Sequence, residues 1–281
     1  MILNNHLSEQ DTKSSPSTEQ TAFEQKWSRI LSQLEPISLE QSASAKLMKR
    51  TDTKFVFPSL LLPGILDNLK SSYRVLEVDK VRLQHYQTLY FDTPDFQLYR
   101  QHHNGQRDRF KLRLRSYLNS NVNYLEVKKK DNHNVTRKSR VETAFPLDGQ
   151  SLDRQSPDIR SFLKSTFPLS EALMVPKITN QFHRISLVSR VDAERLTLDL
   201  NLRFFSPSGN FSIPGIVVAE LKQPHFSLHS PFIKEMRHPG YRPTRFSKYC
   251  VGVALAYPHL KRNAFKPLLL RLEKMVLGGS Y

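Results

Sequence analysis

Charged residues recur at every second position in five short stretches that otherwise resemble β-strands: Lys111–Arg115, Glu126–Lys128, Lys138–Arg140, Arg195–Asp199 and Glu220–Lys222. Successive side chains of a strand point to opposite faces, so the charges of each stretch share one face and its apolar residues share the other. If these strands curl into one sheet, they create a basic concave surface. Such an interior is costly unless it is wet or filled by a polyanion. A phosphate-rich ligand is therefore the first hypothesis.

The residue types within these stretches suit phosphate chemistry. Arg113 and Arg115 offer planar guanidinium groups that match phosphate oxygens, and lysines such as Lys128 add point charges. Glu126 and Glu220 each stand two residues before a lysine, on the same strand face. These carboxylates are either salt-bridge partners or ligands for Mg²⁺ or Mn²⁺, which need only one or two carboxylates when phosphate oxygens complete the shell. For any single stretch, an ordinary solvated sheet face is the competing interpretation.

Composition narrows the class of partner without identifying it. The 281 residues are 38% hydrophobic and 24% charged, and the net charge of +16 favours an anionic partner: nucleic acid, acidic lipid, nucleotide or inorganic phosphate. One cysteine, Cys250, excludes an internal disulfide framework and suits a reducing compartment. No apolar run reaches the roughly 18 residues of a membrane span, and the first residues do not resemble a signal peptide. We expect a soluble, cytoplasmic protein.

Several common catalytic motifs are missing from the sequence. It has neither a Walker phosphate loop nor a GxGxxG motif, and the pair His225 and His229 lacks the glutamate of a zincin. We expect His102 and His103 in a solvated turn between strands. Cys250 lies in an apolar run and is expected to be a packed core thiol rather than a nucleophile.

The apolar periodicity predicts an α+β protein built round an antiparallel barrel or strongly curled sheet of about eight strands, with two or three covering helices. We predict a partly helical, otherwise disordered extension over residues 1–46, the folded domain over 47–258 and a tail over 259–281. A polar linker is expected from Pro36 to Lys46. The expected helices are Phe23–Leu34, 58–69, Ile159–Thr166, Ser230–Met236 and Ser247–Ala256, and the tail suits a helix packed on the domain or a weak membrane-surface contact. The expected strands are Met48–Phe57, His85–Phe91, Asp108–Tyr117, Asn123–Lys130, Thr136–Ala144, Lys177–Val188, Arg195–Phe204 and Gly215–Lys222.

Taken in order, the motifs resemble the VTC domain, the polyphosphate polymerase branch of the triphosphate tunnel metalloenzyme superfamily. Each motif alone is weak, but ten in the family's order, over about residues 47–258, are specific. The matching stretches are Arg50–Phe55, Tyr90–Pro94, Asp95–His102, Arg109–Tyr117, Tyr124–Lys130, Thr136–Arg140, Phe182–Arg184, Arg195–Asp199, Ala219–Lys222 and Ser247–Cys250.

The resemblance implies an eight-stranded antiparallel tunnel in which the γ-phosphoryl group of ATP moves to a growing inorganic polyphosphate chain and ADP is released. A terminal phosphate oxygen is then the nucleophile, so no Ser, Cys or His is required. Carried over by position, the catalytic residues are Lys54, Arg113, Arg115, Lys128 and Lys138, the further phosphate-binding residues are Arg184, Arg195, Lys222 and Lys248, and the metal ligand is Glu220 with Glu126 as a second candidate. The implied cofactor is Mn²⁺ or Mg²⁺, and no specific nucleic acid is expected.

Some features depart from the family pattern. The first strand carries Asp52 and Phe55 where the family usually has Glu and Tyr, so the role of Asp52 is open. Eukaryotic relatives carry an inositol-phosphate-sensing domain before the tunnel and membrane helices after it. The flanking segments are too short for either, so we expect neither.

Two other functions stay open at this stage: a triphosphatase on the same tunnel, and a polyphosphate- or nucleic-acid-binding protein without turnover. The hydrolytic branch typically has a Glu-x-Glu-x-Lys first strand, which is absent here. A nucleic-acid groove would usually add exposed aromatic residues, and most of those near the basic stretches have core-facing parity. We also expect Arg113 and Arg115 to belong to a wet wall whose removal leaves the fold intact.

Overall fold

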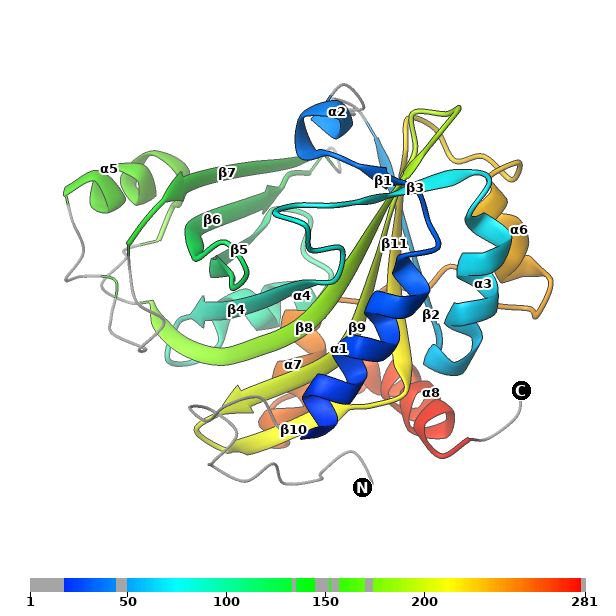
Figure 1. Cartoon of the computed structure of the whole chain (residues 1–281). Coiled ribbons are helices and arrows are strands. Elements are labelled where there is room, and N and C mark those ends of the chain that lie inside the picture. The colour runs from blue at the N-terminus through cyan, green and yellow to red at the C-terminus, as the bar shows by residue number, and fades with distance from the viewer. Residues whose placement is uncertain are drawn as a thin grey trace.

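The protein is built on one large sheet whose main path contains eight strands (Figure 1). The computed structural model describes residues 18–43, 50–132, 135–144, 152, 157–169 and 174–278. All neighbours along the path are antiparallel. Their order is β2 (Thr51–Pro58), β11 (Ile216–Gln223), β9 (Arg195–Ser206), β8 (Val175–Ser189), β4 (Gln84–Asp92), β5 (Arg109–Tyr117), β6 (Val122–Lys130) and β7 (Thr136–Glu142).

The sheet is strongly curled but open. Four strands separate β6 from β11 in the sheet order. Glu220 on β11 is nevertheless close enough to Lys128 on β6 for its negative charge to raise the pKa of that lysine. The two halves of the sheet therefore face each other across a concave interior. In the described residues no hydrogen-bonded ladder joins β7 to β2, which are the two edges of the path. The expected α+β class and curled antiparallel sheet are therefore confirmed, while complete barrel closure is not observed.

Alternation along the strands separates an apolar convex face from the charged concave face. The convex face of β2, β9 and β11 supplies buried residues such as Phe55, Phe57 and Leu198. They pack against α1 (Thr18–Leu31), α3 (Leu62–Leu69) and α6 (Pro231–Arg237), which lie on that side of the sheet in Figure 1. Burying one such side chain contributes roughly 1.5–3 kcal/mol, so this layer holds the curl of the sheet.

Part of the concave face is filled by α7 (Lys248–Ala256), whose residues from Tyr249 to Ala256 are all buried. Ser247 caps this helix by accepting a hydrogen bond from the backbone N–H of Cys250, at 3.3 Å. Gly252 allows close packing on the sheet, because a Cβ there would lie 2.7 Å from Ile178 and 2.8 Å from Phe204. This packing fixes the N-terminus of α7 beside the charged part of the concave face. Cys250 is fully buried, as expected.

The prediction of a polar linker from Pro36 to Lys46 is wrong for Pro36–Ala43, the part that the structure describes. The strand β1 (Pro36–Ile37) pairs in parallel with β3 (Tyr73–Leu76), and α2 (Leu39–Ala43) follows it. Helix α1 is also part of the packed structure, since Trp27 and Leu31 are buried. Two segments lie outside the described residues: 1–17, which were expected to be disordered, and 44–49, where the first strand was expected to begin. The domain boundary at residue 46 stays a prediction.

Three further elements were not predicted. The strand β3 also pairs with β8, and β10 (Gly209–Ile213) extends β9 as a hairpin. His102 and His103 lie in the last turn of α4 (Gln97–His103), so the solvated turn expected for them is wrong. Other elements follow the predictions: α5 is Pro157–Thr166, and α8 (Lys266–Val276) packs on the domain through Leu269, Leu272 and Met275.

The packing of α1 predicts that Trp27→Ala destabilises the whole domain. Trp27 is 2% exposed, and truncating a buried aromatic side chain costs about 3–5 kcal/mol. Thermal unfolding of the variant should shift to clearly lower temperature, whereas the exposed neighbour Gln25→Ala should unfold like the parent. Equal melting temperatures for the two variants would contradict the packing of α1 on the sheet.

Candidate functional site

The strand register brings the predicted charged residues onto one concave surface. Across β5 and β6, Lys111 stands opposite Lys128 and Arg113 opposite Glu126; across β6 and β7, Lys128 stands opposite Lys138. On the other half of the sheet, Glu220 stands opposite Lys54, Lys222 opposite Asp52, and Arg184 opposite Asp199. The two-residue periodicity of the sequence is thus realised in space.

Glu126 is the anchor of the β5–β7 wall. Its side chain is 1% exposed and forms ion pairs with Arg113, at 2.7 Å, and with Lys138. Arg115 lies 4.0 Å from the same carboxylate. Burial opposes ionisation of Glu126, but Arg113, Arg115 and Lys138 outweigh it and lower its pKa to about 2. The carboxylate is therefore ionised and committed to three cations.

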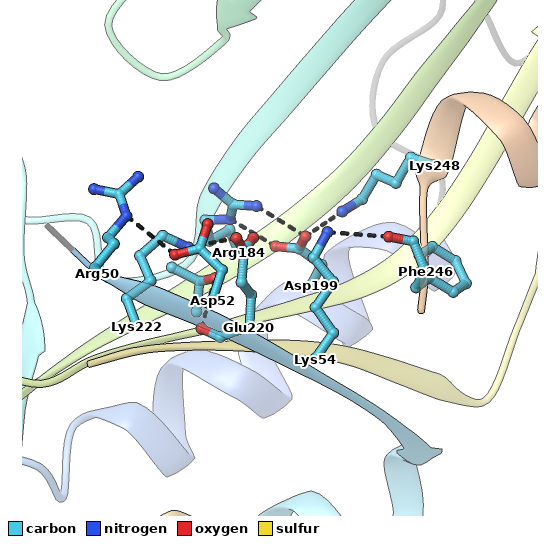
Figure 2. A network of polar contacts seen from close by, with 10 residues as sticks. Arg50, Asp52, Lys54, Arg184, Asp199, Glu220, Lys222, Phe246 and Lys248 are labelled. Atoms are coloured by element: carbon cyan, nitrogen blue, oxygen red, sulfur yellow. Dashed lines mark hydrogen bonds and ion pairs between the residues drawn. The ribbon is translucent and has the colours of Figure 1, made fainter. Parts of the chain in front are cut away.

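Asp199 has the same role on the opposite wall. It accepts two hydrogen bonds from the guanidinium of Arg184, at 2.6 and 2.8 Å, and it also pairs with Lys248 (Figure 2). Burial would raise its pKa, yet these two cations hold it below the usual range. Asp199 thereby links β9 to β8 and to the N-terminus of α7.

Glu220 lies on β11, between β2 and β9 in the sheet, and has fewer ion-pair partners among the described residues than Glu126 or Asp199. It pairs with Lys222 at 2.8 Å, and Lys54, which stands opposite it, donates to the backbone carbonyl of Phe246 at 3.0 Å (Figure 2). Burial again opposes ionisation, but Lys54 and Lys222 lower its pKa well below the usual value. The exposed Asp52 pairs with Arg50 at 3.0 Å.

Lys128 and Lys111 lack a carboxylate within ion-pair distance in the described part of the chain. No hydrogen bond or ion pair is found there for Lys128, and Lys111 donates to the hydroxyl of Ser247 at 2.9 Å. Burial lowers the pKa of Lys111 to about 7. It also lowers the pKa of Lys128 to about 8, with Glu220 opposing the shift and Lys54 reinforcing it. Both lysines and the N-terminus of α7 therefore give the floor of the site excess positive potential.

The remaining predicted residue, Arg195, lies at the margin of this cluster. It stands opposite Lys222 on β11, and burial followed by the nearby charge of Arg50 lowers its pKa. All the other predicted cations belong to the three carboxylate-centred groups or stand between them. Cations outnumber the carboxylates that compensate them, and a multiply charged anion would supply the missing negative charge.

A divalent metal is better accommodated at Glu220, which has one ion-pair partner among the described residues, than at Glu126, which has three. Mg²⁺ and Mn²⁺ accept one or two protein carboxylates together with substrate oxygens, which matches Glu220 between Lys54 and Lys222. Glu126 already holds Arg113 and Lys138 as direct partners, so a further cation there would meet strong repulsion. Within the described residues no group of three or more His, Cys, Asp or Glu side chains could hold a metal ion.

The geometry revises the expectation for Arg113 and Arg115. They are not a wet wall, because Arg113 pairs directly with the buried Glu126 and Arg115 is 8% exposed. Removing one partner of a buried pair typically costs about 3–5 kcal/mol. Replacement of Arg113 by Ala would therefore impair folding as well as ligand binding.

Sequence reasoning missed three polar residues that position the site. Asp199 stands in one of the alternating stretches, and its parity with Arg195 was a usable signal. Lys111 was in the first stretch but was not chosen. Asp92 lies outside the alternating stretches, and its only signal was its place in the family motif Tyr90–Pro94. Its buried carboxylate accepts hydrogen bonds from the backbone of Leu98 and Tyr99 and from the Tyr249 hydroxyl, and so joins β4, α4 and α7.

The protein is thus an α+β protein with a strongly curled, open antiparallel sheet that carries cations on its concave face. The sequence signature of the VTC domain matches residues 49–257, and the chain belongs to that family. No curated protein matches the chain. No helix in the described part of the chain is both long and apolar enough to cross a membrane.

Solved structures show distant similarity. A candidate adenylate cyclase from Bacillus halodurans is 12% identical and has a TM-score of 0.46, with 71% of this chain and 96% of that chain covered. A candidate adenylyl cyclase from Hippeastrum, described as having a dominant triphosphatase activity, is 18% identical with a TM-score of 0.43, covering 74% and 96%. A protein from Pyrococcus horikoshii is 11% identical with a TM-score of 0.42, covering 75% and 99%.

Lys128 gives the cleanest test of anion binding, because no carboxylate among the described residues pairs with it directly. Lys128→Met should weaken tripolyphosphate binding by about ten-fold or more, as expected for a lost charge-assisted contact, while thermal stability is retained. The adjacent Lys129→Met, on the other face of β6, is the matched control and should bind like the parent. Calorimetric titration measures both. Equal affinities for the two variants would place the anion elsewhere.

The lowered lysine pKa values predict a pH dependence of stability. Burial lowers the pKa of Lys111 to about 7 and those of Lys128, Lys138 and Lys248 to about 8. The unfolded chain therefore binds more protons than the free folded protein from about pH 7 to about pH 10, so the stability of the free protein should rise with pH in this window.

A bound polyanion favours the protonated lysines, so the stabilisation that it provides should fall as the pH rises, opposite to the change in stability of the free protein. The increase in melting temperature caused by tripolyphosphate should be largest near pH 7 and should shrink toward about pH 9.5. Differential scanning fluorimetry at matched ionic strength measures this increase. An increase that stays constant or grows with pH would contradict the assignment of these lysines to the anion site.

Proposed function

We propose that the protein is a metal-dependent polyphosphate polymerase that transfers the γ-phosphoryl group of ATP to inorganic polyphosphate. The observation that carries this proposal is the excess of inward cations in a VTC-family fold. Phosphoryl transfer requires mainly alignment and neutralisation of charge, and lysines and arginines on rigid strands supply both. Such a protein would act in the cytoplasm on ATP and polyphosphate.

In the proposed reaction, an ionised oxygen of the terminal phosphate of the chain attacks the γ-phosphorus of ATP. A new P–O bond forms, the bond from the γ-phosphorus to the β,γ-bridging oxygen breaks, and ADP leaves with that electron pair. Arg115 and Arg184 would hold the nucleotide phosphates, with Lys128 beside the transferred group. The attacking oxygen needs no protein base, which agrees with a site whose Cys250 is buried and has a raised pKa caused by that burial.

A divalent ion at Glu220 would neutralise phosphate oxygens and so lower the repulsion between donor and acceptor. The protein's own contribution is to keep Glu220 ionised, through Lys54 and Lys222, and to hold it on the concave face of β11. Glu126 would keep Arg113, Arg115 and Lys138 ordered.

Product analysis tests this proposal directly. Purified protein is incubated with ATP and Mn²⁺, and polymer, ADP and free phosphate are measured together. We expect polymer matched by ADP, with little free phosphate. Free phosphate without polymer would instead show a triphosphatase, and binding without turnover would show a polyphosphate-binding protein; either result overturns the proposal.

Replacing Glu220 tests the metal site separately. Glu220→Gln should abolish the Mn²⁺ dependence of turnover and leave little activity at any metal concentration, because the amide is neutral and a weak metal ligand. The exposed Glu19→Gln is the control and should keep the parental Mn²⁺ titration. An unchanged titration in Glu220→Gln would place the metal ligand elsewhere.

A further inference from the structure

Four aromatic side chains form a continuous row beside the cationic cluster. They come from four adjacent strands and are called the aromatic row: Phe182 on β8, Tyr86 on β4, Tyr117 on β5 and Tyr124 on β6. Phe182 stands opposite Tyr86, and Tyr86 opposite Tyr117. Tyr124 stands opposite Arg115, two residues from Tyr117 on the same strand face.

The rings of the row contact one another in sequence. The centroids of Phe182 and Tyr86 are 5.3 Å apart with the rings nearly parallel, at 5°. Those of Tyr86 and Tyr117 are 4.9 Å apart, and those of Tyr117 and Tyr124 are 5.8 Å apart and edge-on. Phe182 and Tyr86 are buried, whereas Tyr117 and Tyr124 are partly exposed. The row therefore has a packed inner end and an accessible outer end.

Guanidinium groups connect the row to the anion cluster. The Arg115 and Arg184 guanidinium carbons lie 5.8 and 5.1 Å from the centroid of the Tyr86 ring. At the accessible end, the exposed Arg140 lies 4.5 Å over the ring of Tyr124. This cation–π contact covers one face of the Tyr124 ring, so a base would either displace the exposed Arg140 or lie on the other face.

We propose that the accessible end of the aromatic row, Tyr117 and Tyr124, holds the base of the nucleoside triphosphate whose phosphates lie among Arg115 and Arg184. Because the two rings are edge-on, the base would stack on the face of one ring and meet the other with its edge. This inference rests on the proposed function, since it names the base-binding part of the same site. Arg115 and Tyr117 are two residues apart on one strand face, which separates them by roughly 7 Å along the strand. That spacing leaves room for a ribose between a phosphate on Arg115 and a base on Tyr117.

The row also sets the direction of the nucleotide. Base stacking on Tyr117 and Tyr124 puts the α-phosphate next to Arg115 and Arg184. The γ-phosphate then lies deeper, toward Lys128 and the N-terminus of α7. A stacking platform for single-stranded nucleic acid is the competing use of basic and aromatic side chains. The structure favours a single base, because the other two rings of the row are buried.

Binding measurements that do not depend on turnover test the inference. The affinities of ATP and tripolyphosphate are compared by calorimetry for the parent and for Tyr117→Leu/Tyr124→Leu. Base stacking is worth about 1–3 kcal/mol, so the double variant should lose about ten-fold or more in ATP affinity. Its tripolyphosphate affinity should stay unchanged, because the phosphates contact the arginines and lysines.

Two control variants separate stacking from folding. Tyr124→Phe keeps the aromatic ring and should bind ATP like the parent, whereas Tyr124→Leu should bind it more weakly. All variants should have the melting temperature of the parent. Phe110→Leu, on the other face of β5 where Phe110 packs on Phe167, should alter neither affinity.

Three results would overturn the inference. The first is an unchanged ratio of ATP to tripolyphosphate affinity in the double variant. The second is an equal loss of both affinities, which would mean that the tyrosines only support the wall. The third is a parent that binds a short single-stranded oligonucleotide better than ATP. The two proposals can fail separately. If the protein makes no polymer but the double variant still lowers ATP affinity relative to tripolyphosphate affinity, the proposed function is overturned and the base site stands.

Discussion

The structure depends on balancing a high density of positive charge inside a curled sheet. Glu126 and Asp199 hold cations from neighbouring elements, whereas Glu220 pairs with Lys222 on its own strand and faces Lys54 on the next strand. Because desolvation disfavours every charge involved, these ion pairs keep the arginines and lysines charged and oriented. The cations that exceed this compensation are either balanced by a ligand, solvent or counterions or, for the buried lysines, lose their proton as the pH rises.

Because side chains alternate along each strand, one face of the sheet is apolar and packs against helices while the other face carries charges. The apolar convex face packs against α1, α3 and α6 and so sets the curvature, while the concave face remains polar over much of its area. Helix α7 fills the rest of the concave face and brings Ser247 and Lys248 to the charged floor. The apolar packing thus lies on the convex side and around α7, and the proposed anion site lies between them.

Much of this arrangement could be predicted from local patterns. The two-residue period identified the strand faces, and the order of motifs identified the family. The pairing of Arg184 with Asp199 could not be predicted, because it depends on register after a β-bulge between Gln181 and His183. The helical position of His102 and the packing of Trp27 depend on tertiary contacts that override weak local signals. The open edge between β7 and β2 is likewise set by the whole sheet.

The most direct test of the account is an experimental structure of the protein with bound tripolyphosphate. We expect phosphate groups on the concave face, within hydrogen-bond distance of Lys128, Arg115 and Arg184, with the backbone of β5 and β6 unchanged. Tripolyphosphate bound only on the convex face or outside the sheet, with these three side chains retaining only their present contacts, would contradict the central claim that the inward charge is there to bind a polyanion.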